Sequence, residues 1–230
     1  MYFSHSDEIW RDYPELVPGV LLASGITKDA SVGAHPARFN ALAASRLAAS
    51  TEGKLPEVQA WRRTFARMGL KPTQYRCASE SLLRRFKKEG APPPVHPVID
   101  LCNAVSVAFA IPIAAFDVSK IADYIEVRYA AGSEVFLALS SDAEHPEPGE
   151  VIFADSAGRA HARRWTHRQG AYSAVRDETT TVLIVTEGMH RSALADVQKL
   201  TAEIADAFEA TWSAAPKTAI LSQRSSRFDF

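Results

Sequence analysis

The chain has 230 residues, of which 47% are hydrophobic and 23% are charged. This composition is typical of an ordinary globular protein, and the length suffices for one large domain or two small ones. The formal net charge of −1 argues against a general nucleic-acid binder. No apolar stretch approaches the roughly 20 residues that span a bilayer. Residues 1–10 lack the apolar segment of a secretory signal.

The only two cysteines are Cys77 and Cys102. They form no CxxC pair and no cluster of metal ligands, so we expect no structural zinc site, no other metal and no cofactor. Two isolated thiols are typical of a reduced, cytoplasmic protein. We interpret Cys102 as a core residue rather than a nucleophile, because no base lies beside it in the sequence.

We expect a first strand at residues 17–23, at the Pro18-Gly19 turn. Helical patterns then dominate the first part of the chain. The next helix opens at Leu55-Pro56, where Val58, Trp61 and Phe65 form one apolar stripe. We expect helices at residues 37–49, 55–69, 79–89 and 98–108. The proline-rich segment at residues 91–94 lies between the last two and is the best candidate for an internal boundary.

Short segments rich in β-forming residues dominate the second part, separated by Gly, Pro, Asp and Ser. We expect antiparallel strands at residues 124–129, 134–139, 150–154, 159–164 and 180–185, followed by a long amphipathic helix at residues 192–212 and a strand at residues 217–221. Neither part has elements enough to cover its own apolar faces. We therefore predict one domain over residues 1–230, with a helical part at about 1–93 and a strand-rich part at about 94–221.

The charges are segregated along this nearly neutral chain. Nine basic residues and a single acid, Glu80, lie between Arg62 and Lys88. Such a segment indicates either a phosphate-binding face or a solvated helix surface. We take six of its cations as candidate RNA-binding residues: Arg62, Arg63, Arg84, Arg85, Lys87 and Lys88.

Familiar catalytic motifs such as GxSxG, HExxH and GxxxxGK are absent. The most informative segment is HARRWTHRQ, residues 161–169. Arginine binds phosphate through two hydrogen bonds, and Trp or His can stack on a base or ribose. This density of cations, imidazoles and an indole favours a ligand site over an ordinary strand end with a core Trp165.

Two further places carry candidate side chains. Tyr75-Arg76 forms part of a turn before a helix, and Arg76 either reaches a phosphate or, as the simpler interpretation, forms a salt bridge with Glu80. Asn103 lies in the middle of an apolar helix, where its amide needs a partner if it is buried. A ligand contact and a satisfied core amide are both open for Asn103.

Five motifs in order resemble the B3/B4 domain of the phenylalanyl-tRNA synthetase β subunit. PVHPVIDLCNAV at residues 94–105 is similar to the helix P.N..VD..N of that family, and IPIAAFD at residues 111–117 is similar to its QPLHAFD. IEVRYA with GSE (residues 125–134) resembles I.VR.A..GE, and EVIFAD (residues 150–155) resembles a VI.D strand. Residues 61–62, 75–76 and 163–169 resemble the pattern of free-standing members.

The resemblance implies an α+β fold with three β/β/α layers, built from antiparallel strands with flanking helices. In the synthetase this domain hydrolyses tyrosine wrongly attached to phenylalanine tRNA. Three departures concern that activity: Ala114 stands where the family has its editing His, the glycine-rich GVMGG is replaced by residues 164–168, and Val185 stands where the family has a Glu, with Glu187 two residues on. The aminoacylation activity does not carry over.

Two functions remain open. One is a tRNA-related hydrolase that binds aminoacyl-tRNA and edits a mischarged ester in trans; the other is a non-catalytic module that binds RNA or an amino-acid ligand in the same place. For the hydrolase we assign His167 and Gln169 as catalytic residues. The candidate substrate-binding residues are Asn103, Arg164, Trp165, Arg168, Tyr75 and Arg76. We expect Asn103 and His167 to meet in one concave site.

Overall fold

The computed structural model describes residues 1–91 and 93–230, and Pro92, part of the expected boundary segment, lies outside the described residues. The helices are α1 (Asp7–Asp12), α2 (His35–Ala49), α3 (Pro56–Arg67), α4 (Ala78–Glu89), α5 (Pro97–Phe109) and α6 (Ala193–Trp212), with short 3-10 turns at Glu52–Lys54 and Val118–Lys120. The strands are β1 (Tyr2–His5), β2 (Val17–Ser24), β3 (Ile113–Asp117), β4 (Tyr124–Tyr129), β5 (Val135–Leu137), β6 (Ala143–Glu144), β7 (Val151–Ala154), β8 (Arg159–Arg163), β9 (Arg168–Gln169), β10 (Thr181–Gly188), β11 (Lys217–Ile220) and β12 (Arg227–Asp229).

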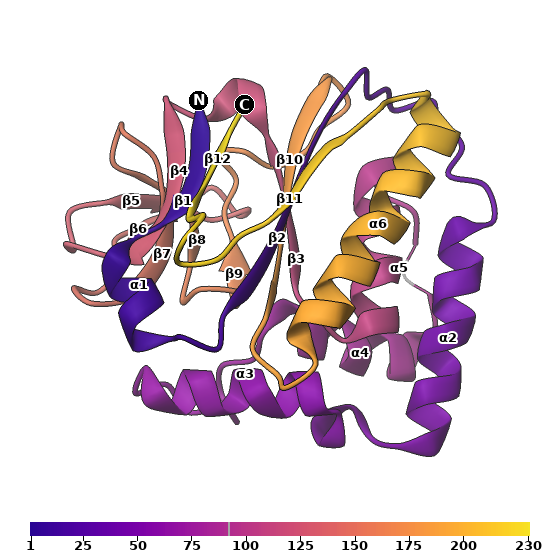
Figure 1. Ribbon diagram of the computed structural model, residues 1–230, viewed down its shortest axis with the longest axis horizontal. Helices are drawn as coiled ribbons and strands as arrows, with labels where there is room; N and C mark the ends of the chain where they lie inside the picture. Colours follow the sequence, from indigo (N-terminus) through magenta and orange to yellow (C-terminus); the bar gives the residue numbers. More distant parts are fainter. Residues whose placement is uncertain (92) are drawn as a thin grey trace.

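A four-stranded antiparallel sheet forms the middle layer, in the order β11-β2-β10-β3. Strand β10 is almost entirely buried, because both faces of this sheet are covered. On its outer face lie α5 and α6, with α2 and α4 packed against α5 (Figure 1). The amphipathic pattern of these helices matches that packing, since Val197, Leu200 and Ile204 of α6 are all buried.

The second sheet lies on the other side of the middle layer, in the order β12-β1-β4-β7-β8-β5-β6, with β9 paired to β8. The layers are therefore sheet, sheet and helices, which confirms the α+β, three-layer interpretation (Figure 1). Most strand pairs are antiparallel, as expected, and two pairs, β1–β4 and β5–β8, are parallel. In both pairs the partners are distant in sequence, so no hairpin fixes their direction.

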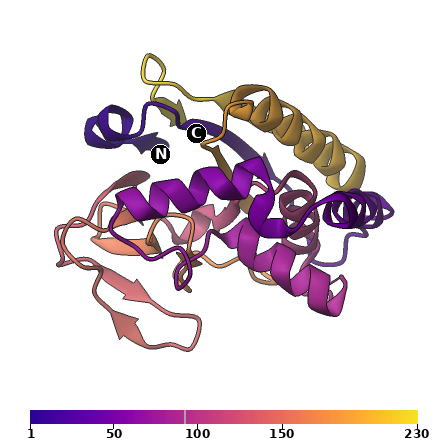
Figure 2. The same cartoon turned by 90° about the horizontal axis from the view of Figure 1, so that it is seen from below.

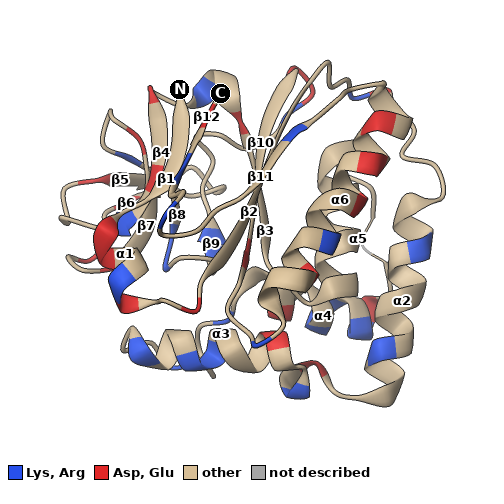
Figure 3. Cartoon of the chain, in the orientation of Figure 1, with Lys and Arg blue, Asp and Glu red and all other residues tan. Residues whose placement is uncertain are grey.

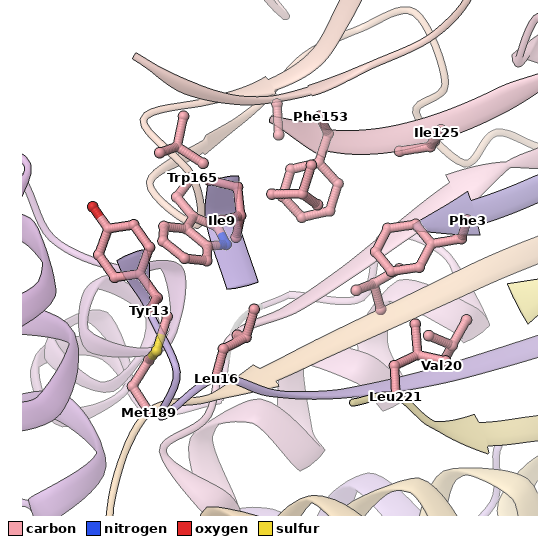
Figure 4. Close-up of a cluster of buried hydrophobic side chains, with 14 of the residues drawn as sticks. Phe3, Ile9, Tyr13, Leu16, Val20, Ile125, Phe153, Trp165, Met189 and Leu221 are labelled. Carbon is pink, nitrogen blue, oxygen red and sulfur yellow. The ribbon is translucent and has the colours of Figure 1, made fainter. Parts of the chain in front are cut away.

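Large apolar side chains fill the layer between the two sheets (Figure 4). Phe3 of β1, Phe153 of β7 and Trp165 are each at most 2% exposed. Phe116 of β3 meets Phe153 with ring centroids 5.6 Å apart. The layer on the other face of the middle sheet is filled mainly by aliphatic residues of α5 and α6.

Helix α3 runs along one end of the two sheets (Figures 1 and 2). Pro56 occupies its first turn, where the missing N–H has no intrahelical role. Its expected stripe is confirmed, since Val58, Trp61 and Phe65 are all buried. The Trp61 indole N–H donates to the backbone oxygen of Glu187 at 3.2 Å, which ties α3 to β10.

Five strands were not anticipated: β1, β3, β6, β9 and β12. Strand β12 pairs with β1 and buries Phe228. Both expected parts of the chain contribute to each sheet, since β2 pairs with β10 and β1 with β4. In the part of the chain that the structure describes, no helix combines the length and apolarity needed to cross a membrane.

Candidate functional site

A small cavity lies between the two sheets, close to the turn that joins β8 to β9. Its volume is about 50 Å³. We call it the inter-sheet cavity. Its walls come from β3, β7, β8, β9, β10 and the turn itself: Ala78, Pro112, Ile113, Ala114, Phe153, Ala162, Trp165, Thr166, His167, Arg168, Gln169, Val185 and Glu187.

The turn at residues 164–167 positions the first candidate. Arg164 and Trp165 have φ angles of 48° and 56°, a left-handed conformation that is uncommon for residues other than glycine. The bend carries His167 to the cavity, where its Nδ1–H donates to the backbone oxygen of Arg76 at 2.7 Å. Because a carbonyl oxygen only accepts, this bond leaves Nε2 as the basic nitrogen of the neutral ring.

The electrostatic surroundings of His167 favour the neutral ring. Burial is the largest effect and lowers the pKa of His167; the bond to Arg76 opposes it, and the charges of Arg164 and Arg168 lower the pKa further. Tyr75 packs edge-on against the imidazole at 5.3 Å, and the Arg164 guanidinium lies over the Tyr75 ring at 4.8 Å. The predicted residues Tyr75, Arg164 and His167 therefore form one stack beside the cavity.

Gln169, Arg168 and Thr166 add polar groups to the wall. The Gln169 amide donates to the backbone oxygen of Ala115 at 2.7 Å, which links β9 to β3 across the two sheets. Arg168 pairs with Glu144 at 2.8 Å. The Thr166 hydroxyl is buried and finds no hydrogen-bond partner among the described residues, so it is a polar group available to a ligand.

Trp165 lies in the core rather than at a surface. It is 0% exposed and contacts Tyr13 and Trp61 at centroid distances of 4.8 and 5.3 Å. The expectation that a base could stack on this ring is wrong, because side chains cover both approaches. Its N–H donates to both carboxylate oxygens of Glu187 at 3.0 Å.

Glu187 is a site residue that the sequence-based assignment left out. It is 2% exposed, lines the cavity, and also accepts from His5 of β1 at 2.7 Å. The alternation of a strand could have revealed it, since Glu187 is two residues after Val185 and so shares its face. This carboxylate joins the two sheets at the cavity.

Ala114 and Val185 are directly opposite each other in the β3–β10 ladder, and both line the cavity. These are two of the three places at which the sequence departs from the family pattern. The two positions therefore meet in space as one apolar pair, and the polar groups of the cavity come from the β8–β9 segment and from Glu187 instead.

Asn103 lies elsewhere. It lines a separate cavity of about 510 Å³ among α2, α4, α5 and the loops before α2 and α5. Helix α5 covers the outer face of the middle sheet, whereas His167 lies on the side of that sheet facing the second sheet. The predicted convergence of Asn103 and His167 is wrong, because α5 presents Asn103 to its neighbouring helices.

Several of the predicted phosphate-binding cations pair with acids. Glu80 is 0% exposed and holds Arg62 at 2.6 Å, Arg76 at 3.5 Å and Arg84 at 3.7 Å. The simpler interpretation of Arg76, a salt bridge with Glu80, is thus confirmed. The other pairs are Lys87 with Glu52, and Arg85 and Lys88 with Glu89. Figure 3 shows basic residues along α3 and α4. Arg63 of α3 is exposed.

A second group, Ser173, His161 and Asp155, has the arrangement of a catalytic triad but is buried away from solvent. The His161 ring contacts the Ser173 hydroxyl at 2.7 Å and Asp155 at 3.1 Å. All three side chains are at most 2% exposed, so no carbonyl group in solution reaches Ser173. Burial opposes ionisation of Asp155, but hydrogen bonds from His161 and Arg159 outweigh it and hold the pKa of this carboxyl below its usual range. This set stabilises the fold.

One described group has the residue types of a metal site: Glu57, His190 and Asp196, with ligand atoms within 4.8 Å of one another. The guanidinium of Arg46 lies 2.7 Å from Glu57, and His190 contacts Asp196 at 2.9 Å. Arg46 already pairs with one carboxylate, so we interpret the arrangement as a hydrogen-bonded network at the start of α6.

Three layers of sheet, sheet and helices, with a histidine-lined cavity between the sheets, define a β/β/α domain. A family model described as the B3/4 domain matches residues 60–211, and the chain belongs to this family.

Two sequence relatives are beta subunits of phenylalanine–tRNA ligase. The chain is 30% identical over 106 residues to the phenylalanine–tRNA ligase beta subunit of Novosphingobium aromaticivorans, which covers 46% of this chain and 13% of that protein. It is 29% identical over 102 residues to the same subunit of Solibacter usitatus, covering 44% and 13%. The chain thus matches only about one eighth of the length of these relatives.

Among solved structures, an N-terminal fragment of the phenylalanyl-tRNA synthetase beta subunit from Pyrococcus horikoshii is similar. The alignment covers 96% of this chain and 54% of that chain, with a TM-score of 0.46 and 11% sequence identity.

Proposed function

We propose that this protein binds the aminoacyl end of an aminoacyl-tRNA in the inter-sheet cavity and hydrolyses its ester bond in trans. The observation that carries the proposal is the placement of His167. Its ring lines the cavity with a fixed tautomer, beside Gln169 and a Thr166 hydroxyl that has no hydrogen-bond partner among the described residues. Membership in the B3/4 family supports a tRNA-related ligand.

His167 acts as the general base. Its Nδ1–H is held by the Arg76 backbone oxygen, so the Nε2 lone pair accepts a proton from water while the water oxygen attacks the ester carbonyl. The lowered pKa of His167 keeps the ring neutral at pH 7. The ribose oxygen then leaves and takes up a proton, which His167 returns. An aminoacyl ester is intrinsically labile, so positioning of water supplies much of the effect.

The ester carbonyl needs a hydrogen-bond donor where negative charge develops. The Thr166 hydroxyl is buried without a partner in the described chain, and the Gln169 amide uses one of its two N–H groups on Ala115. Both residues line the cavity. A donor placed there stabilises the tetrahedral intermediate. Arg164, stacked on Tyr75, binds the terminal ribose or phosphate at the cavity mouth.

The apolar pair Ala114–Val185 receives a small amino-acid side chain, since the cavity of about 50 Å³ has no room for a large one. It supports the second candidate function as well, a module that binds the aminoacyl end without hydrolysing it, because Ala114 supplies no acid–base group at that position. The two functions share one site and differ only in whether His167 activates water.

The RNA body would contact exposed cations on α3 and α4. Arg63 is exposed, and Arg85 and Lys88 pair only with Glu89 at the surface, so these three are available to phosphates. Cys77 and Cys102 are free, buried thiols, and burial raises their pKa values to about 11 and about 12. Two unreactive thiols support the proposed cytoplasmic location.

A deacylation assay across a panel of mischarged tRNAs tests the proposal. We expect one class of ester to be hydrolysed by the wild type, with turnover reduced by His167→Ala and binding weakened by Arg164→Ala. Tight binding of an aminoacyl-tRNA with no deacylation of any tRNA in the panel would support the non-catalytic module. Failure to bind any aminoacyl-tRNA would contradict both functions.

A further inference from the structure

The cavity that contains Asn103, here called the helix cavity, has no part in the proposed hydrolysis. Its volume of about 510 Å³ lies within the roughly 300–1,000 Å³ of small-molecule sites. Three helices and two loops enclose it, and none of its lining residues belongs to the inter-sheet cavity. The two spaces lie on opposite sides of the middle sheet, so a ligand of one leaves the other free.

His96 supplies a buried donor in the wall of the helix cavity. The residue is 4% exposed, and its Nδ1 accepts the Val98 backbone N–H at 3.2 Å as the cap of α5. The proton of the neutral ring is therefore on Nε2, which is buried and finds no partner among the described residues. A buried donor left unpaired is costly, and a ligand that accepts a hydrogen bond there would satisfy it.

His96 also borders a neighbouring hollow, lined on its other side by Val175, Arg176, Asp177 and Glu178. The two acids in that hollow disfavour an anionic acceptor. The helix cavity has the opposite balance, with Lys28 and Arg85 in its wall and Asp100 as the only acid. One Asp100 oxygen already accepts the Val95 backbone N–H at 2.9 Å.

The two cations are available to a ligand. Lys28 pairs with Asp177, and Arg85 with Glu89, at 3.0 and 2.9 Å, and all four side chains are about half exposed or more. Exposed pairs of this kind contribute little and exchange partners readily. The first turn of α2, which also lines the cavity, contains no acid and no capping side chain, so the positive end of its helix dipole adds to the same field.

The remaining wall is apolar. Leu82 and Phe86 of α4 and Ala104 and Val107 of α5 line it. Half-buried Asn40 and Asn103 flank it, and their amides offer further hydrogen bonds. A cavity lined by apolar side chains and two cations suits a ligand with an apolar body and a charged end.

We propose that the helix cavity binds a small organic carboxylate with an aliphatic body, which accepts a hydrogen bond from His96 Nε2–H and pairs with Arg85 and Lys28. A neutral molecule of the same shape would not form ion pairs with Arg85 and Lys28 and should bind more weakly. A free phosphate forgoes the apolar wall. Asn103, which the sequence singled out, contacts this ligand rather than the aminoacyl ester.

Calorimetric titration of the full chain tests this with four probes: 4-methylpentanoate, its neutral amide 4-methylpentanamide, leucine and inorganic phosphate. We expect the carboxylate to bind at least about tenfold more tightly than the amide, the loss of about one charge-assisted hydrogen bond. Leucine has the same body with an added ammonium group. Binding of leucine as tight as or tighter than 4-methylpentanoate supports the proposal and identifies a free amino acid, and weaker binding supports a simple carboxylic acid.

Two variants and a matched control complete the test. His96→Asn keeps an acceptor for the cap of α5 but loses the Nε2 donor, and Arg85→Gln removes an exposed charge; each should weaken carboxylate binding about tenfold. Arg63→Gln, on α3 outside the cavity, should leave it unchanged. If His96→Asn fails to fold, Arg85→Gln decides alone. Equal affinity for carboxylate and amide, equal affinity for phosphate, no binding of any probe at millimolar concentration, or unchanged affinity in the variants would each overturn the proposal.

Discussion

The inter-sheet cavity and the helix cavity lie on opposite sides of the same four-stranded sheet and differ in how their polar groups are held. Around the first, Glu187, Trp165 and His5 bind one another within the core, and His167 is fixed by a backbone oxygen. Around the second, the charged groups are exposed and weakly paired. Chemistry needs a positioned group, whereas reversible binding tolerates adaptable ones. The difference is therefore consistent with the two proposals, a reaction in the first space and an accessory ligand in the second.

The largest effect should come from His167. His167→Ala is expected to lower deacylation turnover by about 10²-fold or more, the usual scale for a positioned acid–base group. Asn103→Ala, in the other cavity, is the matched control and should retain turnover. Equal losses in the two variants would break the comparison. Thermal melts of both proteins check that the fold is intact.

The pH dependence of the same reaction sharpens the assignment. His167 must be neutral to act as a base, so turnover should rise with pH through the pKa of His167 and level off above it. Because burial lowers that pKa from its ordinary value of 6.5, the midpoint should fall below 6.5. A rate–pH profile measured on one mischarged tRNA tests this. A midpoint above 6.5 would exclude a buried His167 as the base.

The free energy of unfolding should fall more on substitution of a residue beside the inter-sheet cavity than of one beside the helix cavity. Trp165→Phe keeps the aromatic packing but removes the N–H that binds Glu187, so we expect a loss of about 1–3 kcal/mol in the free energy of unfolding. Asn103→Ala should change it by no more than about 0.5 kcal/mol, as for a partly exposed side chain whose amide makes no bond within the described chain. Urea unfolding followed by circular dichroism measures both. A larger loss for Asn103 would show that its amide has a structural role.

The smallest expected effect concerns the tRNA body. Replacing Arg63, Arg85 and Lys88 with Ser should reduce the salt dependence of tRNA affinity by about one power of salt concentration for each phosphate that the variant no longer binds. Replacing Glu80-bound Arg62 and Arg84 should instead lower stability, because it leaves Glu80 buried with fewer partners. Filter binding at several salt concentrations measures the first effect. A flat salt response in the wild type would mean that α3 and α4 present only a solvated face.

Much of the fold could be predicted from the sequence because its helices carry local signals. The apolar stripe of α3 and the long apolar stripe of α6 each predict a helix from local sequence alone. Strands β1 and β12 escaped prediction for the opposite reason. Each is at most four residues long, and each becomes a strand only by pairing with a segment far away in the chain.

The candidate site could be predicted in part for similar reasons. His167 and Gln169 lie two residues apart, on the β8–β9 turn and on β9, so the local sequence was enough to single them out. Glu187 was identifiable only through the alternation of β10. Asn103 was misplaced because the direction of its side chain depends on how α5 packs against α2 and α4, which no local pattern encodes.

The pairing of β1 with β12 has a consequence for the order of the elements along the chain. The Phe230 backbone N–H donates to the Met1 oxygen at 3.0 Å, so the two ends lie side by side at one edge of the sheet (Figure 1). A short linker could join them and new ends could be opened in an exposed loop, as circular permutation allows when termini are close. Such a permutant would carry β12 and β1 as one hairpin. The β12–β1 contact, non-local in the present chain, would then be a local one that forms early in folding.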